Sequence, residues 1–200
     1  MKYIDMKFSC LFLLLMLSLP LRASEIFIEA EAFIDKGGWC VDQQFMDVMG
    51  SPYLLAHGAG SPVKDAQTQV KIPSKDTYYI YVHTYNWTSP FCKGNGPGKF
   101  SLRVNEWKST SVGYQGDAWQ WQCAGKVKLN AGNSIIKLHD ETGFEGRCDA
   151  IYLTTVPMKG NADIEVLRQR LVKGYQEVAD AGTFDMVVVG AGVSGICAAV

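Results

Sequence analysis

Between about residues 25 and 157, hydrophobic and polar positions alternate in short runs rich in Tyr, Val, Ile, Phe and Trp. Turn-forming clusters such as Pro73–Asp76, Gly94–Gly98 and Asn130–Asn133 separate the runs. Alternation with a period of two and frequent turns are typical of an antiparallel β-sandwich. We therefore predict a mainly β domain over residues 24–157, of the jelly-roll type. Its predicted strands are Glu25–Phe33, Thr68–Ile72, Thr77–Tyr85, Lys99–Val104, Lys126–Leu129, Ser134–His139 and Asp149–Thr155.

After residue 157 the spacing of apolar residues changes to three and four, which is typical of one face of a helix. Asn161 or Asp163 can cap its start, and Gly182 follows its end. We predict a helix over Ala162–Ala181, within a linker of residues 158–183. The apolar positions on which this rests are Ile164, Leu167, Leu171, Tyr175 and Val178.

Residues 1–23 have the features of a secretory signal peptide. Lys2 and Lys7 precede an apolar run from Cys10 to Leu17, and the small residue Ala23 is a suitable cleavage position. The run is shorter than the roughly 20 apolar residues that span a bilayer. We therefore expect a periplasmic or secreted protein with no stable membrane span after cleavage.

A glycine fingerprint follows the apolar run Phe184–Val189. In dinucleotide-binding folds such glycines make a tight turn, admit a pyrophosphate and let helix and strand pack closely. An ordinary glycine-rich turn is the alternative, because a bare GxGxxG also arises by chance. The apolar run in front of the glycines favours dinucleotide binding over an ordinary turn. We predict that residues 184–200 begin a Rossmann-type α/β domain. Its predicted cofactor-binding residues are Gly190, Ala191, Gly192, Val193, Ser194 and Gly195.

The acidic residue that binds a ribose hydroxyl follows such glycines by about 20 positions, which lies beyond residue 200. We therefore expect the chain to be part of a longer polypeptide, with any catalytic residues outside it.

Several motifs resemble the leader domain of exported bacterial FAD-dependent oxidoreductases. They are Asp42–Asp47, Met49–Gly58, Gly143–Ile151 and the fingerprint segment. The resemblance implies a β-sandwich in front of an FAD domain, oxidoreductase activity and a carbohydrate-derived substrate. Two alternatives stay open: a non-catalytic carbohydrate-binding module with a Rossmann-like remnant, and an NAD-dependent oxidoreductase.

The segment Glu29-Ala30-Glu31 also resembles the first strand of galactose-binding-like carbohydrate modules. There, such a strand and an acidic residue on the last strand, here Asp149, help to hold a structural calcium ion. The resemblance thus implies calcium at Glu29, Glu31 and Asp149. The two glutamates share one face of the predicted strand, and shielded carboxylates need a cation. A salt bridge from Arg147 or Arg103 is the alternative to calcium.

Charge limits the possible partners. The chain has 19 Lys and Arg against 20 Asp and Glu, a net charge of −1, which gives no basic footprint for nucleic acid. Aromatic faces stack on sugar rings, so a small-molecule or glycan ligand is the remaining expectation. Trp87 and Trp119 lie in or beside predicted loops and are the expected ligand contacts, whereas most other large aromatic residues are expected in the core. The histidines show no catalytic or metal-binding spacing.

The cysteines of an exported chain meet an oxidising compartment. Cys92 and Cys123 both follow aromatic strand ends, in loops that a sandwich gathers at its ends. We predict a disulfide between them, with Cys40 as the competing partner. Cys148 is expected to be a small buried residue. Buried free thiols are the alternative for all four.

Overall fold

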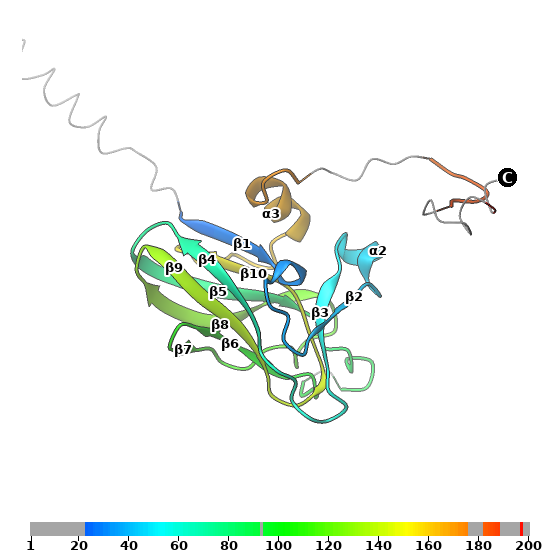
Figure 1. Ribbon diagram of the computed structural model, residues 1–200, viewed down its shortest axis with the longest axis horizontal. Helices are drawn as coiled ribbons and strands as arrows, with labels where there is room; N and C mark the ends of the chain where they lie inside the picture. The colour runs from blue at the N-terminus through cyan, green and yellow to red at the C-terminus, as the bar shows by residue number, and fades with distance from the viewer. Residues whose placement is uncertain (1–22, 93, 176–181, 189–196, 198–200) are drawn as a thin grey trace, which may run out of the picture.

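The described domain is a sandwich of two antiparallel β-sheets in a computed structural model that describes residues 23–92, 94–175, 182–188 and 197 (Figure 1). The six-stranded sheet has the order β2-β3-β10-β5-β8, with β1 also paired to β10, and the four-stranded sheet has the order β4-β9-β6-β7. The first sheet contains β1 (Glu25–Glu29), β2 (Cys40–Asp42), β3 (Tyr53–His57), β5 (Asp76–Thr84), β8 (Gln120–Leu129) and β10 (Phe144–Thr154). The second contains β4 (Ala66–Ile72), β6 (Phe100–Val104), β7 (Trp107–Lys108) and β9 (Gly132–Asp140).

Three short helical segments accompany the sheets: the 3-10 turn η1 (Ala30–Ala32), α2 (Met46–Met49) and α3 (Ile164–Leu171). Helix α3 begins at Asp163, whose side chain accepts hydrogen bonds from the backbone of Glu165 and Val166. It packs on the outer face of the six-stranded sheet, where Leu167 contacts a cluster that includes Tyr81 and Tyr152. No helix among the described residues is long and apolar enough to cross a membrane.

Strand β10 is the centre of the six-stranded sheet, and every residue from Gly146 to Thr154 is buried. One face of the strand belongs to the core between the sheets, with Cys148, Ile151 and Leu153. The other face lies under α3 and α2. Because both faces are covered, the strand has no alternation of polar and apolar residues. This is why the sequence predicts only its second half, Asp149–Thr155.

The mainly β, antiparallel architecture is confirmed, and each predicted strand overlaps an observed one. The prediction missed β2, β3, β7 and α2. Strand β3 reads Tyr-Leu-Leu-Ala-His, four of whose residues are buried, so it lacks the alternating signal. The predicted first strand is too long: it ends at Glu29, and Ala30–Ala32 turn away.

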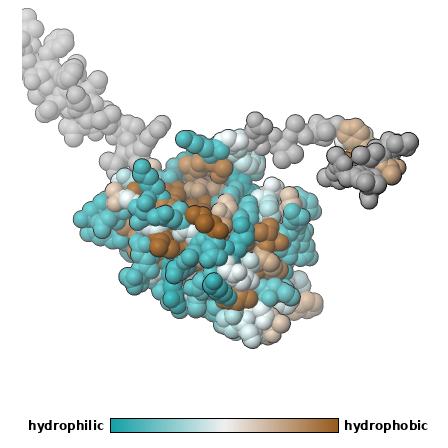
Figure 2. All heavy atoms as spheres, viewed as in Figure 1, coloured by the Kyte–Doolittle hydropathy of each residue, from teal (hydrophilic) through white to brown (hydrophobic). Residues whose placement is uncertain are grey.

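The predicted linker helix is shorter than expected. The helix ends at Leu171, the chain at 172–175 is not helical, and residues 176–181 lie outside the described part. Residues 182–188 contain no strand, so the predicted strand Phe184–Val189 is not formed over the residues described there. The face of the domain seen in Figure 2 is mostly hydrophilic, with separate apolar patches.

Gly143 joins two loops at one end of the sandwich, and we predict that it cannot be replaced. Its φ is +71°, and its carbonyl accepts hydrogen bonds from the backbone of Gly58 and Gly60. A Cβ atom here would lie 2.3 Å from the carbonyl oxygen of Ser61. Gly143→Ala is expected to lower the free energy of unfolding by more than about 2 kcal/mol, measured by denaturant melts.

Gly160→Ala is the matched control. Gly160 has a similar φ of +68° but no atom within 4 Å of an added Cβ, so only the backbone cost of about 1 kcal/mol is expected. Equal losses in the two variants would contradict the close packing at Gly143.

Candidate functional site

The first residues of β8 lie between two pockets at the edge of the six-stranded sheet. Trp119 lines one pocket and Trp121 lines the other. The backbone N–H of Trp121 donates to the side-chain oxygen of Asn161, and its indole N–H donates to the carbonyl of Ala162 at 3.0 Å. The segment that leads into α3 therefore fixes this part of β8.

The pocket beside Trp121, which we call the glutamine pocket, has a volume of about 380 Å³. Its walls combine the ring of Tyr114, the hydroxyl groups of Thr110 and Ser111, and three amide side chains. The ring of Trp121 packs against His83, Phe27 and Tyr152 on the other face of β8. A small set of convergent polar groups beside a ring is the usual composition of a sugar site. The lining residues are Thr110, Ser111, Val112, Tyr114, Gln115, Gln120, Trp121, Gln122 and Cys123.

The amides of this pocket are held by the loop that they face. The side chains of Gln120 and Gln122 both donate to the carbonyl of Gln115, at 3.2 and 3.0 Å. The Gln122 side-chain oxygen accepts from the backbone N–H of Gly113 at 2.9 Å. Gly116 has a φ of +84°, and an added Cβ would lie 1.7 Å from the Gln120 amide nitrogen, so a side chain there would strain the backbone and displace that amide. These bonds pre-order the pocket before a ligand arrives.

The pocket beside Trp119, which we call the His83 pocket, has a volume of about 350 Å³ and lies between α2 and the start of α3. Val48 and Met49 of α2 form one side, and residues 161–164 form the other. His83 is buried, and its Nδ1 lies 2.6 Å from Asp149 Oδ2. The imidazole is thus oriented by a buried carboxylate.

Trp119 belongs to a cluster of rings on the outer face of the sheet. Its indole stacks on His83 and on Tyr85, each at 5.6 Å between centroids, and contacts Tyr53 and Phe45 edge-on. The buried indole nitrogen of Trp119 has no hydrogen-bond partner. Packing therefore immobilises the ring. Ligand contact by Trp119 stays a prediction from the sequence.

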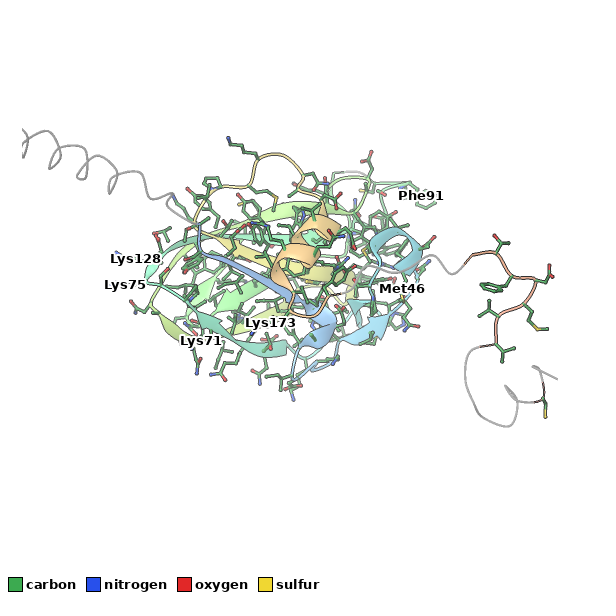
Figure 3. All side chains as sticks on the ribbon, turned by 90° about the horizontal axis from the view of Figure 1, so that it is seen from above. Met46, Lys71, Lys75, Phe91, Lys128 and Lys173 are labelled. Carbon is green, nitrogen blue, oxygen red and sulfur yellow. The ribbon has the colours of Figure 1, made fainter. Side chains whose placement is uncertain are left out.

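Trp87 lines neither of these pockets. Its indole N–H donates to the carbonyl of Phe144 at 3.0 Å, and the guanidinium of Arg147 lies over the ring at 5.7 Å. The same loop carries Phe91, whose side chain is 94% exposed. In Figure 3, Phe91 and Met46 project from one end of the domain, and Lys71, Lys75 and Lys128 from the other. Trp87 thus holds a loop, and the structure does not bring it together with Trp119 in one pocket.

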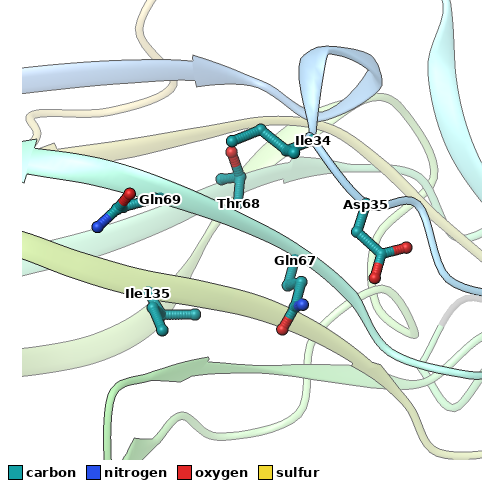
Figure 4. A pocket seen from close by; sticks show the side chains of 6 residues that line it. All are labelled: Ile34, Asp35, Gln67, Thr68, Gln69 and Ile135. Atoms are coloured by element: carbon teal, nitrogen blue, oxygen red, sulfur yellow. The ribbon is translucent and has the colours of Figure 1, made fainter.

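A third hollow lies on the four-stranded sheet, between the chain at residues 34–35 and strands β4 and β9 (Figure 4). Its volume is about 230 Å³. Its walls are aliphatic side chains, amides, a hydroxyl and a carboxylate, with no ring for a sugar to stack on. The lining residues are Ile34, Asp35, Gln67, Thr68, Gln69 and Ile135.

The carboxylates for which calcium was expected surround the guanidinium of Arg168 instead. Arg168 of α3 is 1% exposed. It donates to Glu29 at 2.8 Å through Nε, to Asp149 at 3.0 Å through Nη2, to the Ser51 hydroxyl at 2.5 Å, and to the carbonyl of Met49. The cation at these acids is therefore an arginine side chain. It is neither Arg147, whose ion-pair partner is Glu145, nor the exposed Arg103.

This arrangement does not fit a calcium ion. Among the described residues, no group of three or more His, Cys, Asp or Glu side chains is placed to hold a metal. Glu31 does not join the others, because the chain leaves the strand after Glu29, so the two glutamates do not share a strand face as expected. One of its oxygens is buried without a hydrogen-bond partner. The guanidinium of Arg168 already binds the carboxylate oxygens that a calcium ion would need as ligands.

Burial sets the proton state of these acids. Burial, and then the charge of Glu29, raises the pKa of Glu31 to about 8. Burial also raises the pKa of Glu29, although the Arg168 hydrogen bond opposes it. Burial alone would lower the pKa of Arg168, but its bond to Glu29 and the charge of Asp149 raise it overall. Arg168 therefore stays charged, and Glu31 is protonated at neutral pH.

The predicted disulfide is not formed: the five described cysteines are all free. The prediction placed Cys123 in a loop, but it lies within β8 opposite Tyr81. Cys92 ends a turn that follows β5. Cys148 is buried in the core as expected, and burial raises the pKa of its thiol well above the ordinary value.

The glycine fingerprint, Gly190 to Gly195, lies outside the described residues, as does the signal segment 1–22. Cofactor binding at the first and export by the second remain predictions from the sequence. Sequence reasoning missed the glutamine pocket and Arg168. The alternation Gln120-Trp121-Gln122 was a usable signal for an edge strand, whereas nothing in the sequence pairs Arg168 with Glu29.

The raised pKa of Glu31 predicts that stability falls with rising pH. Between the ordinary value of 4.5 and about 8, the folded state holds a proton that the unfolded state has lost. The stabilisation is therefore complete below pH 4.5 and is lost as pH rises through 8, by up to about 1 kcal/mol per unit. In denaturant melts, Glu31→Gln should reduce the fall of the unfolding free energy with pH. At pH 8.5 this variant should be more stable than the wild type.

The exposed Glu106 provides the control, because Glu106→Gln should leave the slope unchanged. A wild-type stability that is constant between pH 5 and 8 would contradict the assignment of a protonated Glu31.

Comparisons with known proteins place the fold. No protein-family model matches the sequence, and no curated protein matches it. Among solved structures, the domain is similar to a GH26-CBM35 β-(1,4)-mannanase of Podospora anserina, with a TM-score of 0.53 and 23% identity over 69% of this chain. The chain spans only 29% of that mannanase. A family 35 carbohydrate-binding module from Clostridium thermocellum matches with a TM-score of 0.49 and 20% identity. The match covers 65% of this chain and 97% of that module. The C-terminal CBM6 of a Zobellia galactanivorans laminarinase, LamC, matches with a TM-score of 0.48 and 17% identity. The match covers 65% of this chain and 98% of that module.

At these identities the similarity shows the fold alone: a galactose-binding-like β-sandwich of the kind found in carbohydrate-binding modules. The interpretation as an FAD-dependent oxidoreductase is wrong by this comparison. The structures reported above are described as carbohydrate-binding modules or as a mannanase that carries one, and none of them is described as a flavin enzyme.

Proposed function

We propose that the domain is a non-catalytic carbohydrate-binding module that binds glycan in the glutamine pocket. The observation that carries this proposal is the composition of that pocket: three amide side chains, the hydroxyl groups of Thr110 and Ser111, and the ring of Tyr114 around about 380 Å³. This volume suits one or two sugar units rather than a whole chain.

Sugar recognition needs both kinds of group. A ring face packs against the apolar C–H face of a pyranose, and amides offer a donor and an acceptor to adjacent hydroxyls. The side chain of Gln115 is exposed and the ring of Tyr114 is half-buried, so both are accessible to a ligand. The pocket lies at the edge strand of the six-stranded sheet, β8.

Two of the other hollows support the choice by contrast. The hollow on the four-stranded sheet has no ring. The His83 pocket has a ring, but helices α2 and α3 border it, and its indole nitrogen is buried. Of the three, the glutamine pocket combines a place at the sheet edge with both chemical requirements.

The fold similarity supports the class of ligand and suggests the first probe. The Podospora anserina protein is a β-(1,4)-mannanase that carries a CBM35. We therefore take β-1,4-linked manno-oligosaccharides as the first ligands to test, within a panel that includes xylo-, gluco- and galacto-oligosaccharides.

Tyr114→Ala is predicted to weaken glycan binding about tenfold, which corresponds to about 1.4 kcal/mol, because it removes the accessible ring of the pocket. Gln115→Ala is expected to weaken it several-fold by removing one amide. Isothermal titration calorimetry with the best oligosaccharide of the panel measures both effects.

Phe91→Ala is the matched control, since Phe91 is the most exposed aromatic ring described and lines none of the pockets. Its affinity should equal that of the wild type. No binding to any oligosaccharide of the panel, or an equal loss in Phe91→Ala and Tyr114→Ala, would overturn the proposal.

A further inference from the structure

Helix α3 carries two arginines that face the sandwich in different ways. Arg170 is exposed and pairs with Glu25 at the start of β1. Arg168, two residues earlier, is 1% exposed and lies among Glu29, Asp149 and Ser51. The two positions allow a buried and a surface ion pair on one helix to be compared directly.

Asp149 cannot be buried alone in this fold. It is 0% exposed, and it lies where the pairing of β10 with β5 shifts register, between the pairs Cys148–Thr84 and Ala150–His83. A bulge of this kind re-aims a side chain. An isolated buried carboxylate is costly, so a cation must face it. The Ser51 hydroxyl carries no charge, and His83 Nδ1 lies against Oδ2, whereas the permanently charged guanidinium of Arg168 lies against Oδ1.

We propose that Arg168 supplies the charge that a metal ion would otherwise have to supply, so that the sandwich is independent of metal and α3 is an obligatory part of its folding unit. The guanidinium bridges four points of the sandwich: Glu29 at the end of β1, Met49 in α2, Ser51 after α2, and Asp149 in β10. The folding unit accordingly extends through Leu171, past the sequence-based limit at residue 157.

Two further observations agree with an obligatory helix. Leu167 is 4% exposed and Leu171 packs beside it, over the rings of Tyr81, Tyr152 and Phe27. Without α3 these rings would form an exposed apolar face on the outer side of the six-stranded sheet. The charge and the apolar surface therefore require the same helix.

The first test measures the metal dependence of the wild-type chain. The midpoint of thermal unfolding, Tm, should change by less than about 1 °C on addition of 5 mM EDTA or 5 mM CaCl₂, because no metal takes part. A Tm that falls with EDTA, or rises saturably with Ca²⁺, would overturn the proposal.

The second test compares the two arginines. Arg168→Met should lower Tm by about 10 °C, since it leaves buried carboxylates without a counter-charge. Arg170→Met, its neighbour on the same helix, should lower Tm by less than about 3 °C. Similar small losses in both variants would overturn the proposal.

The third test separates charge from packing. In the wild type, Glu29→Gln should lower Tm, because Arg168 loses an anionic partner. In the Arg168→Met background the same change should raise Tm, because it removes an uncompensated charge. Where Arg168→Met fails to fold, Arg168→Lys serves as the background, and Glu29→Gln should then lower Tm less than in the wild type. An equal loss in both backgrounds would show that charge compensation is not the role of Arg168.

Discussion

A buried carboxylate at the middle of the central strand sets the main constraint on this domain. Asp149 lies in a register shift of β10 and is fully buried, so its charge requires a cation and its oxygens require donors. Arg168, Ser51 and His83 meet these needs from three other parts of the chain. Such a network adds little net stability compared with apolar packing, but breaking it is costly. The positions of α2, α3 and β5 around β10 are thereby tied together.

This constraint divides the surface of the six-stranded sheet. Helix α3 and the segment before it cover the middle of the outer face, over Tyr81 and Tyr152. The same segment reaches the edge strand β8, where it bonds Trp121 through Asn161 and Ala162. The proposed glycan site therefore lies beside the region that the charge network stabilises. Its amides are ordered by the loop at residues 113–116 rather than by the network itself.

The sequence predicts the layers of this fold better than its contacts. Alternation identifies strands with one solvent-facing side, such as β4 and β9, but it fails for β3 and the first half of β10, whose two faces are both buried. The partner of Glu29 could not be assigned, because Arg168 stands 139 positions away and nothing in the pattern distinguishes it from the other arginines. Cys123 was misplaced because the start of β8 was set six residues too late.

The central claim is that glycan binds in the glutamine pocket, and the most direct measurement is NMR titration of the ¹⁵N-labelled chain with the best oligosaccharide. Glutamine side-chain amides give separate signals, and the protein carries them both in this pocket and on the four-stranded sheet. The account predicts ligand-dependent shifts for the side chains of Gln115, Gln120 and Gln122, with those of Gln67 and Gln69 unchanged. Shifts confined to Gln67 and Gln69 would contradict it.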